Sequence, residues 1–386
     1  MTASERVTAY LDNAATTPMR PEAIAAMVPL LADGFANPSG IHAPARRARR
    51  AVDEARERVG AALGCAPGEV VFTSGGTESD NLAVQGAHRH LGGTVVVSAI
   101  EHQAVLRPAT ALGARVVPVG AAASIDLEAL GGALDDTVRL VSVMGVNSEV
   151  GVIQPIADVV RLVRERAPEA LVHCDAVQAF PWLDVAELCA DCDLVSISAH
   201  KFGGPKGVGV LVARGAAGRR LSPLLLGGSQ EQALRPGTEN VPGIAATGAA
   251  ATATVSEREE TVRRVGALRD LFVDGLRAAW PQLLEPAPRA ARVAGSAHVS
   301  FPGIDAEELL FLLDERGVCA SMGAACASGA REPSHVLLAM GWTRARARSA
   351  ARFSLGWATS EDEVRQALAL TPPLLERLAG SVPAAR

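Results

Sequence analysis

The chain contains only two lysines, Lys201 and Lys206, and they lie within six residues of each other. Lysine and arginine together number 37, so the other 35 basic residues are arginines. Arginine stays protonated, whereas the amine of lysine can lose its proton and attack a carbonyl group. The presence of both lysines in this one segment favours Schiff-base chemistry there. A composition biased toward arginine would explain the small number of lysines equally well.

Residues 73–78, Thr-Ser-Gly-Gly-Thr-Glu, stand between an expected strand and an expected helix. Paired glycines at such a turn let backbone N–H groups approach an anion, and the hydroxyl of Thr77 can assist. Ser198 and His200 place further hydrogen-bond donors beside Lys201. A phosphate group fits this donor set, while a simple Ser/Thr helix cap would account for the turn alone.

Asp175 follows another buried-strand pattern, at the edge where open α/β sheets bind ligands. Its carboxylate could cap the next helix, or it could hold a proton on the pyridine nitrogen of a cofactor. Taken together, the amine, the acid and the anion cradle suit a phosphorylated aldehyde that contains a ring nitrogen.

Cys326 lies among Gly, Ala and Ser residues, which favours an accessible thiol, whereas Cys319 beside Val318 is expected to be buried. Cys189 and Cys192 have CxxC spacing, but no second pair or histidine follows at zinc-site spacing. We therefore expect buried thiols at that pair and no metal site. Cys326 is the candidate nucleophile.

The elements that must position these residues alternate between strand and helix from about residue 70 to 215. Seven short runs rich in Val, Ile and Leu predict strands buried on both faces, at 70–72, 94–98, 115–119, 138–143, 171–174, 194–198 and 208–212. This alternation predicts an α/β fold with a mainly parallel sheet covered by helices.

The pattern changes after about residue 250. A long helical stretch at 257–280 precedes shorter strand and helix units, which predicts a smaller α+β domain. We expect a large domain at 15–255 and a small domain formed by 1–14 and 256–386, which would carry the segment around Cys326.

Composition narrows the class of protein. The net charge is −5 and there is no basic cluster without acidic neighbours, which argues against direct binding of nucleic acid. Residues 1–10 lack the apolar region of a secretory signal, and no apolar run is long enough to span a bilayer. We expect a cytoplasmic enzyme with reduced thiols and no membrane association.

Ordered motifs along nearly the whole chain resemble the cysteine desulfurases, which are pyridoxal 5'-phosphate (PLP) enzymes of the class V aminotransferase group. Apart from the segments around Asp175 and Lys201, the matching motifs are YLDNAATTP (10–18), NPS with His42 (37–42), FTSGGTESDNL (72–82), EHQAVL (101–106), RPGTEN (235–240) and RFSLG (352–356). The short segment around Cys326, followed by EPSHVL, is similar to the iron–sulfur and nitrogen-fixation group.

The resemblance implies PLP-dependent transferase fold type I, with a seven-stranded sheet, and a role for each matched residue. Lys201 would carry the cofactor, His102 would stack on its ring and shuttle a proton, and Asp175 would pair with the ring nitrogen. Gln178 would contact the ring hydroxyl. The phosphate would be held by Gly76, Thr77, Ser198, His200 and, from a neighbouring subunit, Thr238.

The resemblance also implies that Arg352 clamps the substrate carboxylate, with Asn37 on the substrate side, and that Cys326 receives the sulfur of L-cysteine as a persulfide. The sequence departs from the family pattern at three places. Ser148 replaces an asparagine beside the cofactor, the segment before Cys326 loses two hydroxyls and gains Met322, and Gln232 replaces a basic residue.

The expected partners are L-cysteine, a second copy of the chain in a homodimer, and a sulfur-acceptor protein serving iron–sulfur assembly, tRNA thiolation or DNA phosphorothioation. Two other functions are compatible with the same scaffold. One is a class V aminotransferase or selenocysteine lyase, and the other is a non-catalytic persulfide relay.

Overall fold

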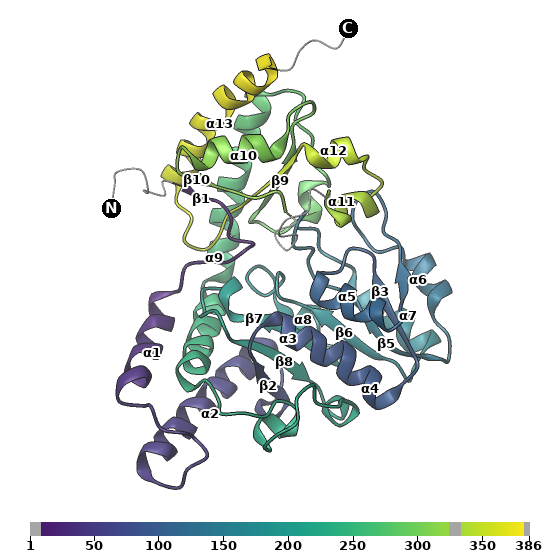
Figure 1. The fold of residues 1–386 in the computed structure, drawn as a ribbon, viewed down its shortest axis with the longest axis vertical. Coiled ribbons are helices and arrows are strands. Elements are labelled where there is room, and N and C mark those ends of the chain that lie inside the picture. The colour runs from purple at the N-terminus through teal and green to yellow at the C-terminus, as the bar shows by residue number, and fades with distance from the viewer. Residues whose placement is uncertain (1–8, 324–332, 382–386) are drawn as a thin grey trace.

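The computed structural model describes residues 9–323 and 333–381, and its largest element is a seven-stranded sheet (Figure 1). The strand order is β2-β8-β7-β6-β5-β3-β4. The strands are β2 (Val70–Thr73), β3 (Thr94–Ser98), β4 (Arg115–Val117), β5 (Val138–Ser142), β6 (Leu171–Asp175), β7 (Leu194–Ser198) and β8 (Gly209–Ala213). β8 runs antiparallel to both of its neighbours, β2 and β7, and the other four pairings of the sheet are parallel, so the mainly parallel sheet is confirmed.

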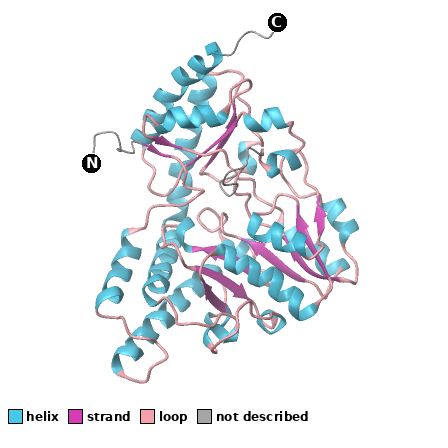
Figure 2. Cartoon of the chain, in the orientation of Figure 1, coloured by secondary structure: helices cyan, strands magenta, loops and turns pink. Residues whose placement is uncertain are grey.

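Both faces of this sheet are covered, as the apolar strands predict (Figure 2). Val70 and Phe72 belong to one buried cluster, whereas Val71 between them belongs to the cluster on the opposite face. The helices of this part are α1 (Pro21–Ala32), α2 (Ala43–Leu63), α3 (Gly76–Asn81), α4 (Ala87–Leu91), α5 (Gln103–Ala111), α6 (Leu127–Ala133), α7 (Ile156–Arg166) and α8 (Val185–Leu188). A wide helical turn at Leu82–Gly86 joins α3 to α4.

A smaller part has a core of its own, built from both ends of the chain. Its strands form two pairs, the parallel β1 (Ala9–Tyr10) with β10 (Val318–Cys319) and the antiparallel β9 (Ser296–Ser300) with β11 (Ala350–Ser354). Its helices are α10 (Ala306–Asp314), α11 (His335–Ala339), α12 (Arg344–Arg348) and α13 (Glu361–Ser381). In Figure 1 this part lies above the large sheet.

Helix α9 (Val241–Ala279) runs through both parts as one helix of 39 residues. Ile244 and Ala250 pack into the core beside the large sheet, and Val265 and Phe272 pack into the smaller core. The division expected at residues 255 and 256 falls inside this helix, and the domain boundaries remain a prediction. Within the described ranges, no helix is both long and apolar enough to cross a membrane.

The structure tests the expected burial of three thiols. Cys189 and Cys192 are buried, as their sequence context predicts. Cys319 was expected to be buried and is only half-buried. It ends the two-residue strand β10, whose single partner in its sheet is β1, so part of the side chain is left uncovered.

Candidate active site

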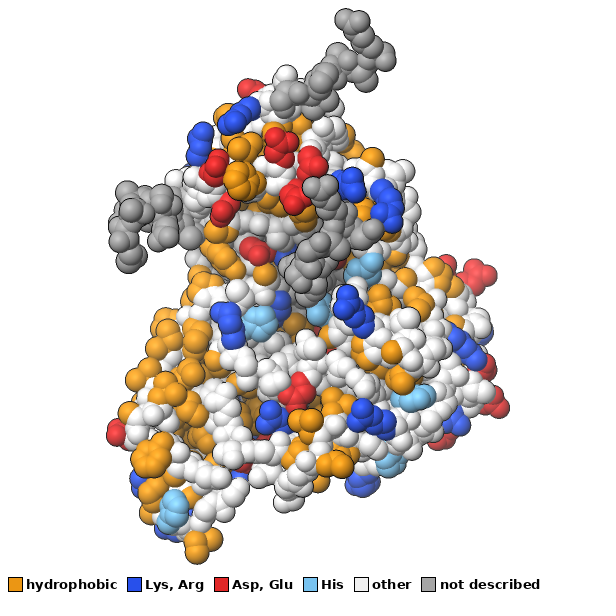
Figure 3. Space-filling model, in the orientation of Figure 1, with side chains coloured by type: hydrophobic (Ala, Val, Ile, Leu, Met, Phe, Trp, Pro, Cys, Tyr) orange, Lys and Arg blue, Asp and Glu red, His pale blue; other side chains and the backbone are white. Residues whose placement is uncertain are grey.

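A cavity of about 460 Å³ opens at the edge of the sheet where the parallel strands end. Its wall is built from the turns after β2, β3, β5, β6 and β7. Arg352, on β11 of the smaller part, lines the cavity from another side. Figure 3 shows Lys, Arg and His side chains gathered on the face between the smaller part and the large sheet. The cavity lies at the edge at which the sequence predicted a ligand site.

Lys201 lies in the turn Ala199–Lys201, directly after β7. Its Nζ donates hydrogen bonds to the main-chain oxygens of Ala14 (2.6 Å) and Ala15 (2.8 Å), in the segment that follows β1. The side chain of Gln178 donates to the same Ala14 oxygen at 2.8 Å. Neutral acceptors therefore hold the predicted nucleophilic amine at the cavity wall.

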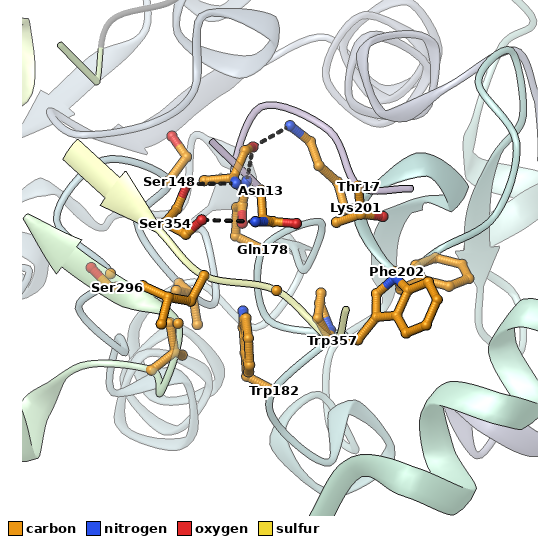
Figure 4. A pocket seen from close by; sticks show the side chains of 18 of the residues that line it. Asn13, Thr17, Ser148, Gln178, Trp182, Lys201, Phe202, Ser296, Ser354 and Trp357 are labelled. Carbon is orange, nitrogen blue, oxygen red and sulfur yellow. Dashed lines mark hydrogen bonds between the residues drawn. The ribbon is translucent and has the colours of Figure 1, made fainter. Parts of the chain in front are cut away.

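A second, narrower pocket shares Lys201, Gln178 and Ser148 with this cavity. Figure 4 shows Asn13 and Gln178 together along one side, with the indole rings of Trp182 and Trp357 across from them. Its volume of about 40 Å³ suits one or a few water molecules rather than a substrate. The larger cavity is therefore the candidate active site.

Asp175 is the last residue of β6 and is buried. One of its carboxylate oxygens accepts a hydrogen bond from the N–H of Val177 at 3.0 Å. Burial raises the pKa of this carboxyl, and the charges that His102 and Lys201 can carry oppose the rise. A carboxylate in this position is suited to hold a proton on a ring nitrogen in the cavity.

His102 caps helix α5 at its N-terminus. Its Nδ1 accepts a hydrogen bond from the N–H of Ala104 at 3.2 Å, so the neutral ring carries its hydrogen on Nε2. Burial lowers the pKa of His102, an effect that Asp175 opposes. A neutral imidazole at the cavity wall can stack on a ring and donate the hydrogen on its Nε2, while its Nδ1 stays engaged by the main chain.

The anion cradle is the turn between β2 and α3. A side chain at Gly76 would bring its Cβ to 2.9 Å from Cγ2 of Val177, so only glycine fits there without displacement. Burial, with smaller effects from Lys201 and Lys206, lowers the pKa of His200 to about 4, so its ring is neutral. The other donors lining the cavity beside this turn are Thr77 and Ser198.

Arg352 is buried, with 4% of its side chain exposed. Its Nη1 donates to the main-chain oxygens of Ser148 (3.0 Å) and Gly323 (3.2 Å), and its Nη2 pairs with Asp12 at 2.9 Å. Its Nε is buried and has no hydrogen-bond partner in the part of the chain that the structure describes. The guanidinium is thus fixed in place with donor capacity remaining.

Two predicted site residues do not line this cavity. Asn37 and Thr238 are both exposed, on different segments. Their neighbours Ser39 and Glu239 border one groove on the surface, so the two segments meet away from the chain's own cavity. Cys326 lies outside the described residues, although Gly323 and Pro333 on either side of it line the cavity.

Among the carboxyl and imidazole groups that line the cavity, four have no role assigned from the sequence, namely those of Asp80, Glu101, Glu149 and His335. Burial raises the pKa of Asp80 and of Glu101 well above the ordinary value of each carboxyl. One signal was available for Asp80, because it lies four residues after Gly76 on the same helix and therefore on the same face. Nothing in the local sequence indicates that Glu101 turns inward beside His102.

The cavity fits a phosphorylated pyridine aldehyde such as PLP. An amine, a carboxyl and an imidazole meet beside an anion cradle that a side chain at Gly76 would obstruct.

Comparisons with known proteins agree with this chemistry. The family model described as aminotransferase class-V matches residues 9–367. A cysteine desulfurase IscS of Methanosarcina thermophila is 38% identical over 388 residues, covering 98% of this chain and 95% of that protein. A solved NifS-like protein superposes with a TM-score of 0.89 at 35% identity, covering 96% of this chain and 100% of that chain. The solved SspA in complex with cysteine has a TM-score of 0.78 at 32% identity, covering 91% and 100%.

Proposed function

Because this chain belongs to the class-V aminotransferase family and is a PLP-dependent cysteine desulfurase, we propose that it passes sulfur from L-cysteine through Cys326 to an acceptor protein. The observation that carries the proposal is the convergence of Lys201, Asp175, His102 and Arg352 on one cavity. Bound PLP supplies an electron sink for the carbanion formed at Cα of the substrate.

The chain's own residues then have distinct tasks. Arg352 binds the substrate carboxylate, and Lys201 takes the proton from Cα. Asp175 keeps a proton on the ring nitrogen. His102, whose neutral ring carries hydrogen on Nε2, is placed to exchange a proton with the substrate thiol. The phosphate is held by the cradle residues and their neighbours, Gly76, Thr77, Ser198 and His200.

The sulfur step forms one bond and breaks another. The thiolate of Cys326 attacks the sulfur of the substrate, so an S–S bond forms as the Cβ–S bond breaks. The electron pair of the broken bond stays with Cβ, which gains a proton. Lys201 returns its proton to Cα, and L-alanine leaves. Cys326 then carries the persulfide. A thiolate of the acceptor protein attacks its outer sulfur, so a new S–S bond forms on the acceptor and the thiolate of Cys326 leaves.

Release of L-alanine from L-cysteine in the presence of a reductant tests this function directly. We expect Cys326→Ser to bind PLP with an unchanged absorbance spectrum and to release no alanine. A Cys326→Ser protein that turned over at the wild-type rate would contradict the nucleophile assignment. Transfer of labelled sulfur from wild-type protein to candidate acceptors would identify the acceptor.

We further propose a homodimer in which each subunit completes the site of the other. Thr238 and Asn37 are exposed and do not line the cavity of their own subunit, which supports a contribution of both residues to the active site of a second subunit. The exposed face of α1 and the following segment is also apolar, with Ile24, Val28 and Phe35 on the surface. Light scattering coupled to size exclusion measures the mass, and a monomer would contradict the proposal. We also propose a cytoplasmic location for the protein.

A further inference from the structure

Three successive residues with side chains adopt left-handed backbone conformations. Glu231, Gln232 and Ala233 have φ angles of 46°, 60° and 61°. Such angles are uncommon for any residue other than glycine, and runs of them are rarer. Strain of this kind persists only where surrounding contacts impose it, and it concentrates at functional sites.

The contacts that impose this turn come from Glu231 and Arg56. The carboxylate of Glu231 is buried and accepts hydrogen bonds from Nη1 and Nη2 of Arg56, at 2.9 and 2.5 Å. It also accepts from the main-chain N–H of Phe72 at 2.8 Å. Phe72 lies on β2, the edge strand that leads into the anion cradle, so the turn is anchored to the cradle's own strand.

The segment beyond the turn is tied down on both sides of Thr238. Arg235 pairs with Glu78 of helix α3 at 3.1 Å. Glu239, which is buried, pairs with Arg49 of helix α2 at 2.8 Å. Thr238 lies between these two ion pairs and is exposed, so the segment presents it outward in a fixed position.

We propose that Glu231 and Arg56 are positioning residues that hold residues 229–240 so that Thr238 reaches the phosphate bound by a second copy of this chain. The inference rests on the proposed role of Thr238 in the neighbouring site. Without its anchor, the strained turn relaxes toward right-handed conformations and Thr238 moves away from the phosphate.

The test measures the dissociation constant of PLP for the full-length protein after its cofactor has been removed and added back. Thr238→Val should weaken PLP binding about tenfold, the effect of losing one hydrogen bond to a charged group. Glu231→Gln should weaken it by a similar factor and leave the KM for L-cysteine at saturating PLP unchanged. Glu285→Gln, which disrupts a comparable ion-pair cluster around Arg292 away from this segment, is the matched control and should leave PLP affinity unchanged.

Relief of the strain provides the decisive variant. Glycine adopts left-handed conformations freely, so Gln232→Gly with Ala233→Gly should restore PLP affinity in the Glu231→Gln protein to within about twofold of wild type. Normal PLP affinity in Glu231→Gln, with weakened affinity in Thr238→Val, would overturn this inference alone. Normal affinity in Thr238→Val would overturn the role of Thr238 as well. Gln232→Gly also removes the hydrogen bond from the side chain of Gln232 to the main-chain oxygen of Gly68. If the glycine pair leaves affinity normal in the otherwise wild-type protein but does not restore it in Glu231→Gln, Glu231 does not act through the turn.

Discussion

Replacement of Arg352 by lysine tests the proposed carboxylate clamp most sharply, because it keeps the charge and changes the number of donors. The guanidinium has five N–H groups. The two N–H groups of Nη1 donate to the main-chain oxygens of Ser148 and Gly323, and one N–H of Nη2 donates to the carboxylate of Asp12. Among the described residues, the N–H of Nε, which is buried, and the second N–H of Nη2 have no acceptor, and two N–H groups are the number a bidentate carboxylate needs.

The ammonium group of lysine has three N–H groups in all. These match the three acceptors that Arg352 already serves, so Arg352→Lys leaves none for the substrate. Each hydrogen bond between charged groups contributes about 1.5–3 kcal/mol, so two of them give a loss of at least about 3 kcal/mol. That free energy corresponds to a roughly 150-fold weaker affinity for L-cysteine. The retained charge keeps Asp12 paired, so we expect the variant to fold.

The assay is binding without turnover. In a Cys326→Ser background, L-cysteine is titrated and its affinity is read from the absorbance of bound PLP. Cysteamine, which has the same amine and thiol but no carboxylate, is the control ligand and should bind both proteins equally. Arg292→Lys is the control variant, because Arg292 is a buried arginine paired with Glu285 that does not line the cavity.

Two results would refute this reasoning. One is a loss of affinity for L-cysteine of less than about threefold in Arg352→Lys, which would mean that the remaining N–H groups do not meet the carboxylate. The other is an equal loss for cysteamine, which would mean that the variant distorts the cavity generally.

Three further predictions concern other buried groups. Lys201→Arg should lack covalently attached PLP after borohydride reduction and lose at least about 100-fold in turnover; retention of attached cofactor would contradict the assignment. Asp175→Asn should still bind PLP, with a shifted absorbance spectrum, and lose at least about 100-fold in alanine release; unchanged turnover would exclude its role at the ring nitrogen. Burial lowers the pKa of His173 from 6.5 to about 3, so between these values the unfolded state binds a proton that the native state does not. The free energy of unfolding should therefore fall as pH drops from 6.5 to 4, by about 3 kcal/mol from this residue. His173→Gln should flatten that decline in thermal melts, and an unchanged slope would contradict the argument.

The strands were predictable because their apolar runs have to be buried on both faces. A short β-branched run such as Thr-Val-Val-Val-Ser at 94–98 favours a strand in a covered sheet, and all seven expected strands are present in the sheet. The antiparallel direction of β8 was not predictable, since strand direction depends on how the chain crosses between strands. The continuity of α9 was also missed, because its Ala- and Thr-rich half and its charged half differ in composition although both favour helix.

The site was predictable where one residue type is chemically indispensable. Lys201, Asp175 and His102 each lie at or just beyond the end of a strand, and parallel strands bring their carboxyl ends together. Asp12 shows the opposite case. It lies 340 residues from Arg352 in the sequence, and only the pairing of the first strand's segment with β11 brings the two side chains to 2.9 Å.

Helix α9 also has a mechanical consequence. At 1.5 Å per residue its 39 residues span about 58 Å, and it is gripped at one end by the core beside the sheet and at the other by the smaller core. The two cores are therefore connected by one continuous helix and not by a flexible hinge. A movement that separates Arg352 from Lys201 would therefore have to bend this helix or break its packing in one of the two cores.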